Sequence, residues 1–101
     1  MHFSRMHFSS AMTLKIAKEV DGKRTILRLS GRIQFANLED IEELMEGNAE
    51  TIVLDLEEVT LVDVDVVRFL GTREAEGVEL VNCSPYIRDW IFRERSTDER
   101  D

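Results

Sequence analysis

The chain has 101 residues, of which 43% are hydrophobic and 34% are charged, with a formal net charge of -8. This length suits one domain with one hydrophobic core. The acidic balance disfavours nucleic-acid binding, because phosphate backbones are negative. No run approaches the roughly 18 continuous apolar residues that span a membrane. The single cysteine, Cys83, makes neither an intrachain disulfide nor a zinc site, which fits a cytoplasmic protein.

The first eleven residues, MHFSRMHFSSA, are predicted to be a flexible leader. They repeat MHFS and lack the apolar core of a signal peptide. Both histidines, His2 and His7, lie here, and we interpret them as surface residues rather than metal ligands. Met12 is a candidate native start. The domain is therefore expected to span 12–95, with a charged, disordered tail over 96–101.

Two antiparallel strands are predicted to open the domain. Loose alternation over Met12–Val20 indicates an edge strand. Asp21 and Gly22 follow, and this dipeptide is typical of a tight hairpin turn. Arg24–Ile33 is then the partner strand, and Gly31 within it predicts a bulge or a close backbone approach.

Apolar residues at helical spacing predict a helix over Phe35–Met45. We expect Asn37 to cap its N-terminus, with Asp40 three residues on in the capping-box position. Gly47 and Asn48 are typical of a helix end.

The apolar, β-branched run Ile52–Leu56 predicts a strand buried on both faces. A loop over Glu57–Val62 is expected to follow, and then a helix from Asp63, its N-cap, to about Glu76. In α/β sheets, ligands and partners meet the carboxyl ends of strands and the helix N-termini that follow them. This connection is therefore the expected working surface.

A short buried strand is predicted over Val78–Val81, followed by a helix from Tyr86 to about Arg95. Ser84 is expected to cap that helix, with Pro85 at its first position, where the missing N–H does no harm. The order β-β-α-β-α-β-α indicates an α/β fold, with a mixed four-stranded sheet and helices packed on it.

Three stretches resemble the STAS domain, the fold of the anti-sigma factor antagonists. LSGRI at Leu29–Ile33 is similar to the family's second strand, IVLDLEEVTLVD at Ile52–Asp63 to its signature, and LVNCSP at Leu80–Pro85 to the entry to its third helix. The resemblance covers about 12–95 and rests on joint order and spacing. It implies a non-catalytic bacterial regulator without cofactor or metal, whose protein partner is an anti-sigma factor that acts as a serine kinase.

The sequence departs from the family at the helix start. The family has Asp-Ser-Ser-Gly there, and the partner kinase phosphorylates the second serine. Here Asp63 is kept, but Asp65 stands at the phosphoacceptor position. Aspartate has no hydroxyl and carries one charge, against about -1.5 to -2 for phosphoserine. Asp65 is then either a fixed partial phosphomimic or an ordinary acid in a first helical turn. The expected partner-binding residues are Thr60, Asp63, Val64, Asp65 and Val66.

A second departure concerns the C-terminal side, where the family usually continues with another strand and helix. An open edge there invites a partner or a homodimer. Tyr86, Trp90 and Phe92 are the candidates to cover or form that surface. The alternative function is therefore a scaffold or homo-oligomerisation module outside sigma regulation.

An enzyme is the weaker interpretation. Cys83 lies at a helix N-terminus, which can lower a thiol pKa, but no histidine base lies in the domain, so we interpret it as an inert core residue. Asp55, with Asp63 and Asp65, remains a less favoured alternative as a magnesium-binding or phosphoryl-accepting site. Other candidate phosphorylation sites are the hydroxyls of Thr60, Thr72 and Ser84.

Overall fold

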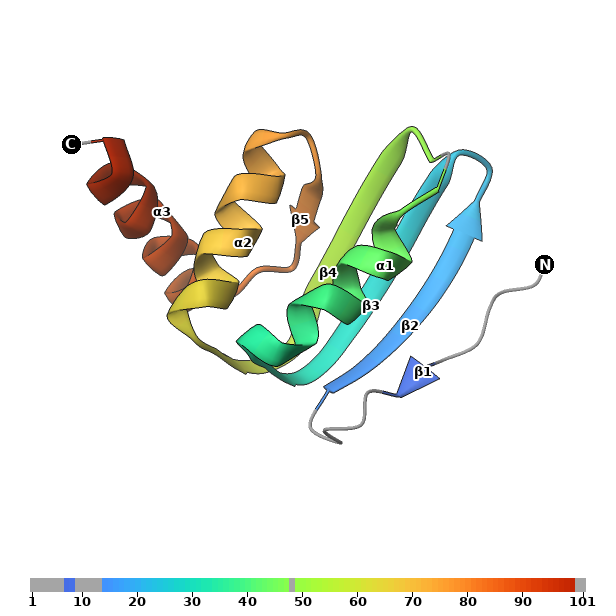
Figure 1. Cartoon of the computed structure of the whole chain (residues 1–101), viewed down its shortest axis with the longest axis horizontal. Helices are drawn as coiled ribbons and strands as arrows, with labels where there is room; N and C mark the ends of the chain where they lie inside the picture. The colour runs from blue at the N-terminus through green and yellow to red at the C-terminus, as the bar shows by residue number, and fades with distance from the viewer. Residues whose placement is uncertain (1–6, 9–13, 48, 100–101) are drawn as a thin grey trace.

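The computed structural model describes residues 7–8, 14–47 and 49–99 (Figure 1). The expectations for His2, Met12 and Asn48 lie outside these residues, as does most of the leader. The predicted α/β fold is confirmed, with strands β2 to β5 forming the mixed four-stranded sheet and three helices packed on it. A two-residue strand, β1 (His7–Phe8), adds a fifth strand beside β2.

The predicted hairpin is confirmed. Strand β2 (Leu14–Asp21) pairs antiparallel with β3 (Arg24–Ile33) along its whole length. Gly22 has a φ of 64° at the turn, a conformation that glycine adopts without a Cβ penalty. The predicted edge position of β2 is wrong where β1 pairs with it.

The predicted loop over Glu57–Val62 is wrong, because β4 (Thr51–Val62) is a continuous strand of 12 residues. It pairs parallel with β3 over nearly the whole length of both strands. The partner strand supplies the reason: β3 continues to Ile33, so its backbone offers hydrogen bonds to β4 well beyond the apolar run that the sequence pattern detects.

Two bulges allow β4 to stay in register with the shorter β3. Arg28 pairs with Asp55 and Ser30 with Glu58, so β4 holds one extra residue there; a second extra residue, Thr60, lies opposite the Gly31–Arg32 step. The first bulge turns Val59 towards the core, and the second returns Leu61 to the outer face, because each one-residue shift reverses the facing of a strand.

The first helix begins later than predicted. A 3₁₀ turn, η1 (Phe35–Asn37), precedes α1 (Leu38–Met45). Asn37 stands at the N-cap position of α1, but its side-chain oxygen accepts from the Gln34 N–H at 2.8 Å instead of capping α1. The predicted capping interaction is therefore wrong, and Asn37 is buried because it closes the preceding turn.

Helix α2 (Val64–Ala75) leads into β5 (Glu79–Val81), which pairs parallel with β4 at the sheet edge and is half-buried rather than fully buried. Ser84 caps α3 (Pro85–Glu99), its hydroxyl accepting from the Ile87 N–H at 3.3 Å, as predicted. The helix runs past its predicted end near Arg95, since no glycine or proline interrupts the sequence from Ser96 to Glu99.

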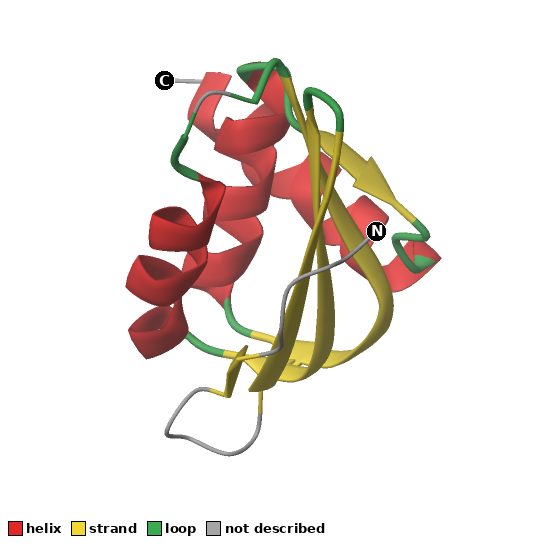
Figure 2. Cartoon of the chain, turned by 90° about the vertical axis from the view of Figure 1, so that its right-hand side faces the viewer, coloured by secondary structure: helices red, strands yellow, loops and turns green. Residues whose placement is uncertain are grey.

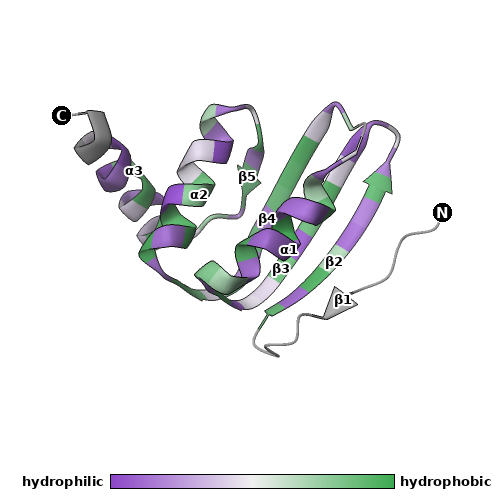
Figure 3. Ribbon diagram, viewed as in Figure 1, coloured by the Kyte–Doolittle hydropathy of each residue, from purple (hydrophilic) through white to green (hydrophobic). Residues whose placement is uncertain are grey.

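Helices α1 and α2 lie on the same face of the sheet (Figure 2). Inward residues of β3, such as Leu27 and Leu29, share one core with Ile41 of α1 and Leu70 of α2. The outward side of α1 is largely hydrophilic (Figure 3). The alternation of apolar and polar residues in β2 and β3 follows from burial of mainly one face. In β4 the adjacent residues Val53 and Leu54 are both buried, in agreement with the predicted burial of this strand on both faces.

Candidate functional site

The start of α2 is organised by Asp63. One carboxylate oxygen, Oδ1, accepts from the Val66 N–H at 3.1 Å and caps the helix, as predicted. The other, Oδ2, accepts from the Phe35 N–H at 3.2 Å. Asp63 therefore ties the end of the β3–α1 connection to the first turn of α2, a contact that the sequence pattern does not reveal.

The next three positions differ in their access to a partner. Val64 is half-buried and Asp65 is exposed in the first turn of α2. An acidic side chain there is stabilised by the positive end of the helix dipole. Val66 is fully buried in the core, so its side chain is not available on this surface.

Thr60 reaches the surface as the extra residue of the second β4 bulge, and its side chain is exposed. It lies in a strand and not in a loop. Bulges beside functional sites re-aim single side chains, and this one does so two residues before Val62 enters the core.

Sequence reasoning missed two exposed apolar residues at this site. Phe35 is 66% exposed and Leu61 is 50% exposed. Phe35 is held beside Asp63 by its N–H bond, and Leu61 precedes Asp63 by two residues. The pairing of Leu61 with Arg32 on the outer face follows from the bulges, which no periodicity in the sequence announces.

Asp55 belongs to a different cluster. Its Oδ1 accepts from the Asn82 side-chain amide at 3.0 Å and from the Glu57 N–H at 3.1 Å, and its Oδ2 lies 3.7 Å from Arg28 Nε. Asn82 adopts a positive φ of 57° in the turn before α3. These contacts join β4 to that turn, so Asp55 has a structural part here.

Across residues 7–8, 14–47 and 49–99, no group of three or more acidic, histidine or cysteine side chains is arranged to hold a metal ion. In particular, Asp55 is not brought into one ligand set with Asp63 and Asp65. The described geometry thus gives no support to a magnesium site formed by these three aspartates.

Cys83 is half-buried between β5 and α3. Burial raises the pKa of its thiol above the ordinary value, while the nearby Arg88 guanidinium acts in the opposite direction. A raised pKa disfavours the reactive thiolate. This environment agrees with the interpretation of Cys83 as an unreactive packing residue.

The aromatic residues of α3 divide into two kinds. Trp90 is half-buried against the core, and its ring centroid lies 6.0 Å from that of Tyr86. Tyr86 is 50% exposed and Phe92 is 66% exposed. Packing on the core therefore accounts for Trp90, while Tyr86 and Phe92 stand at the surface.

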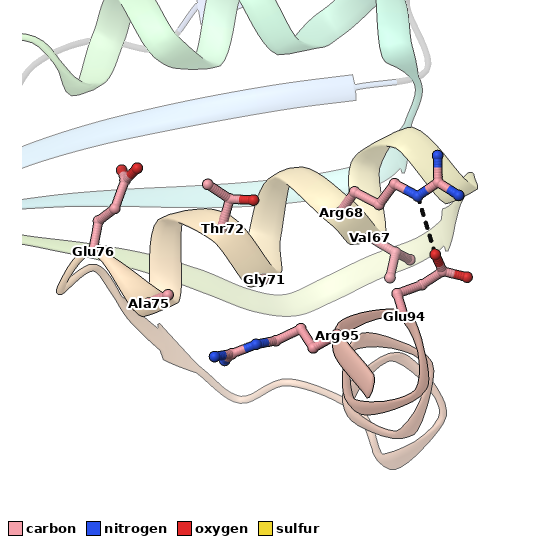
Figure 4. Close-up of a pocket in the computed structure, with 8 residues that line it drawn as sticks. All are labelled: Val67, Arg68, Gly71, Thr72, Ala75, Glu76, Glu94 and Arg95. Atoms are coloured by element: carbon pink, nitrogen blue, oxygen red, sulfur yellow. Dashed lines mark hydrogen bonds and ion pairs between the residues drawn. The ribbon is translucent and has the colours of Figure 1, made fainter. Parts of the chain in front are cut away.

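A shallow groove of about 270 Å³ lies between α2 and α3 (Figure 4). Its floor is Gly71, where a Cβ would stand 3.3 Å from Ile91 Cγ2. Arg68 and Glu94 form an ion pair of 3.0 Å across it, and Arg95 extends along it towards Ala75 (Figure 4). These contacts join the two helices.

The family model for the STAS domain matches residues 14–94. The chain belongs to the STAS domain family. Its fold is similar to that of the antisigma-factor antagonist STAS domain from Rhodobacter sphaeroides, with a TM-score of 0.56 and 19% identity over 69% of this chain and 87% of that one. The start of α2 that Asp63 organises thus lies within the matched domain.

A second solved structure, that of Mglu, is 28% identical with a TM-score of 0.53; the match covers 67% of this chain and 19% of that chain. This STAS domain therefore spans about a fifth of the length of Mglu. No curated protein matches the sequence. In the described part of the chain, no helix combines the length and apolar character needed to cross a membrane.

Proposed function

We propose that this STAS domain is a non-catalytic regulator of the anti-sigma-factor-antagonist kind, which works by binding another protein at the start of α2. The observation that carries the proposal is the position of Asp65. It is exposed one residue after the start of α2, while Asp63 is held inward by two hydrogen bonds. A partner would therefore meet the Asp65 carboxylate directly.

The proposed partner is an anti-sigma factor with serine kinase activity. Asp65 occupies the position that the family motif gives to the phosphoacceptor serine, so a permanent negative charge replaces a reversible one. Binding is then not switched by phosphorylation at this position. The charge is smaller than that of phosphoserine, and it acts as a partial mimic of the phosphorylated, weakly binding form.

The test compares the wild type with Asp65→Ser and, as a matched control, Asp89→Ser. Asp89 is an exposed acid on α3 that pairs with Arg93 at 3.2 Å. Each protein is immobilised and exposed to native cell extract, and any captured serine kinase is then purified and titrated. Asp65→Ser should bind the kinase at least about fivefold more tightly, about 1 kcal/mol, and accept phosphate at the new hydroxyl. Asp89→Ser should do neither.

Capture of no kinase by any of the three proteins, or equal kinase affinity for the wild type and Asp65→Ser, would contradict the proposal. In the first case the second candidate takes its place, a homo-oligomerisation module. The exposed Tyr86 and Phe92 on α3 favour it, since a pair of exposed aromatic residues suits a protein interface. Sedimentation of wild type and Phe92→Ser over a range of concentrations tests that candidate.

A further inference from the structure

Two of the large apolar side chains that are exposed in the described residues flank Asp63. They are Phe35 and Leu61, and the half-buried Val64 lies next to Asp63 in α2. We call Phe35, Leu61, Val64 and Asp65 the β4–α2 surface. Exposed aromatic and aliphatic residues that gather at one place mark interaction sites more often than scattered ones do.

The backbone that carries Phe35 is fixed before any partner arrives. The Gln34 N–H donates to Asn37 Oδ1 at 2.8 Å, and the Phe35 N–H donates to Asp63 Oδ2 at 3.2 Å. Asn37 is itself 96% buried, since only 4% of its surface is exposed. A rigidly held aromatic residue loses little conformational freedom on binding, which is a property of binding hot spots.

Acidic residues surround this surface. Asp65 is exposed on it, and Glu39 and Asp40 lie exposed in the first turn of α1, which begins three residues after Phe35. The cations nearby are Arg32, the register partner of Leu61, and Arg68, which is paired with Glu94 at 3.0 Å.

A second copy of the chain is a poor occupant, because two such acidic surfaces would repel each other and each copy carries a net charge of -8. Charge complementarity therefore selects a positively charged partner.

We infer that the β4–α2 surface docks an amphipathic protein segment that places apolar side chains on Phe35 and Leu61 and lysine or arginine side chains beside the acidic first turn of α1. The inference rests on the proposed function, and it names the chemistry of the partner segment and adds two contact residues. Apolar contact at the centre with complementary charge around it is the usual arrangement of a protein interface.

The probe is a fluorescein-labelled amphipathic peptide of about 18 residues made of leucine and lysine. The control peptide has the same apolar pattern, with glutamate in place of lysine. Binding is followed by fluorescence anisotropy. The wild type should bind the lysine peptide and not the glutamate peptide, and salt should weaken the binding. Phe35→Ser and Leu61→Ser should each weaken it at least about tenfold.

Two exposed apolar residues elsewhere serve as matched controls. Phe92 has the same 66% exposure as Phe35, and Val20 is 57% exposed on β2. Phe92→Ser and Val20→Ser should keep the affinity within about twofold of the wild type. Because all four side chains lie at the surface, the variants should fold, and circular dichroism melting checks this.

No binding of the lysine peptide up to about 100 µM would overturn the inference. So would equal losses in Phe35→Ser and Phe92→Ser, or equal affinity for the two peptides. The kinase titration separates this inference from the proposed function. Kinase binding that survives Phe35→Ser overturns the docking inference alone. A Phe35-dependent peptide site without any kinase partner overturns the proposed function alone.

Discussion

The carboxylate of Asp63 joins its own helix to Phe35, 28 residues earlier in the chain. Its Oδ2 accepts from the Phe35 N–H at 3.2 Å while its Oδ1 accepts from the Val66 N–H at 3.1 Å. A serine or threonine cap has one side-chain oxygen and would serve the two donors less well. An aspartate at this position therefore fixes the turn η1, which follows β3, and the start of α2 relative to each other.

Asp63→Ala removes both acceptors and should lower the free energy of unfolding by about 1–3 kcal/mol, the loss of a helix cap together with one further hydrogen bond. Asp63→Asn keeps one oxygen and should lower it by roughly half as much. Urea denaturation followed by circular dichroism measures both. Asp65→Ala is the control, because this exposed carboxylate contributes only about 0.3–1 kcal/mol through the helix dipole. Equal losses for Asp63→Asn and Asp63→Ala would argue against a shared carboxylate.

Arg73 should be the main polar link between α1 and α2. Its Nη2 lies 2.7 Å from Glu42 of α1, its Nη1 lies 3.1 Å from Glu76, and its guanidinium stands 5.3 Å from the centroid of the Phe69 ring. The bond to Glu42 raises the pKa of Arg73, so it stays charged at any ordinary pH. Arg73→Ala should lower the free energy of unfolding by about 1–2 kcal/mol, discounted for partial exposure.

Arg73→Lys separates charge from geometry in that link. An ammonium group cannot bind both carboxylates with the fixed geometry of a guanidinium. Arg73→Lys should therefore lower the free energy of unfolding by more than half as much as Arg73→Ala does. Glu76→Gln, which removes only the pair within α2, should lower the free energy of unfolding by about 0.2–0.5 kcal/mol. If Glu76→Gln lowered the free energy of unfolding as much as Arg73→Ala does, the link from Arg73 to α1 would contribute nothing measurable to stability.

Local sequence signals were sufficient where the determinant is local. The Asp21–Gly22 turn, the Asp63 cap and the Ser84 cap each depend on residues within four positions, and all three are confirmed. The prediction fails where a strand that is distant in the sequence determines the local secondary structure. Glu57–Val62 forms a strand because β3 lies beside it, and its charged and polar residues carry no strand pattern of their own.

The same distinction between local and distant determinants applies to the residues of the candidate site. The composition of the motif indicates that Asp63 and Asp65 begin a helix, and they do. Val66 is named as a partner-binding residue because it falls at the glycine of the family motif, and the structure buries its side chain in the core. No local signal places Phe35 at this site, because only the folded sheet brings it beside Asp63. The roles of Thr60, Val64 and Asp65 in partner binding remain predictions.

Cys83 should react slowly in the folded protein. Burial raises the pKa of its thiol, so at pH 8 the folded state holds less thiolate than the unfolded chain does. The stability that this group contributes is present in full below the unfolded pKa and falls as the pH rises through the folded pKa. Iodoacetamide alkylation followed by mass spectrometry should be several-fold slower in buffer than in urea at equal pH. A native rate equal to the unfolded rate would mean that the thiol is exposed.

The absence of a side chain at Gly71 should allow α2 and α3 to pack closely where they cross. A Cβ at this position would lie 3.3 Å from Ile91 Cγ2, closer than most such contacts, and 3.5 Å from Arg95 Cδ, an ordinary van der Waals contact. Gly71→Val adds a branched side chain in that gap and should lower the free energy of unfolding by about 1–3 kcal/mol through overpacking. Gly71→Ala should change it less, since the gain in helix propensity of about 1 kcal/mol offsets the crowding.

The control for the low helix propensity of valine is Thr72→Val, at the next position of the same helix. Thr72 is exposed and threonine and valine have similar helix propensities, so this variant should stay within about 0.5 kcal/mol of the wild type. Thermal and urea unfolding of the three variants measure the effect. Equal stability of Gly71→Val and Thr72→Val would show that α3 can move away from α2 without loss, and the close packing at Gly71 would then not hold the two helices together.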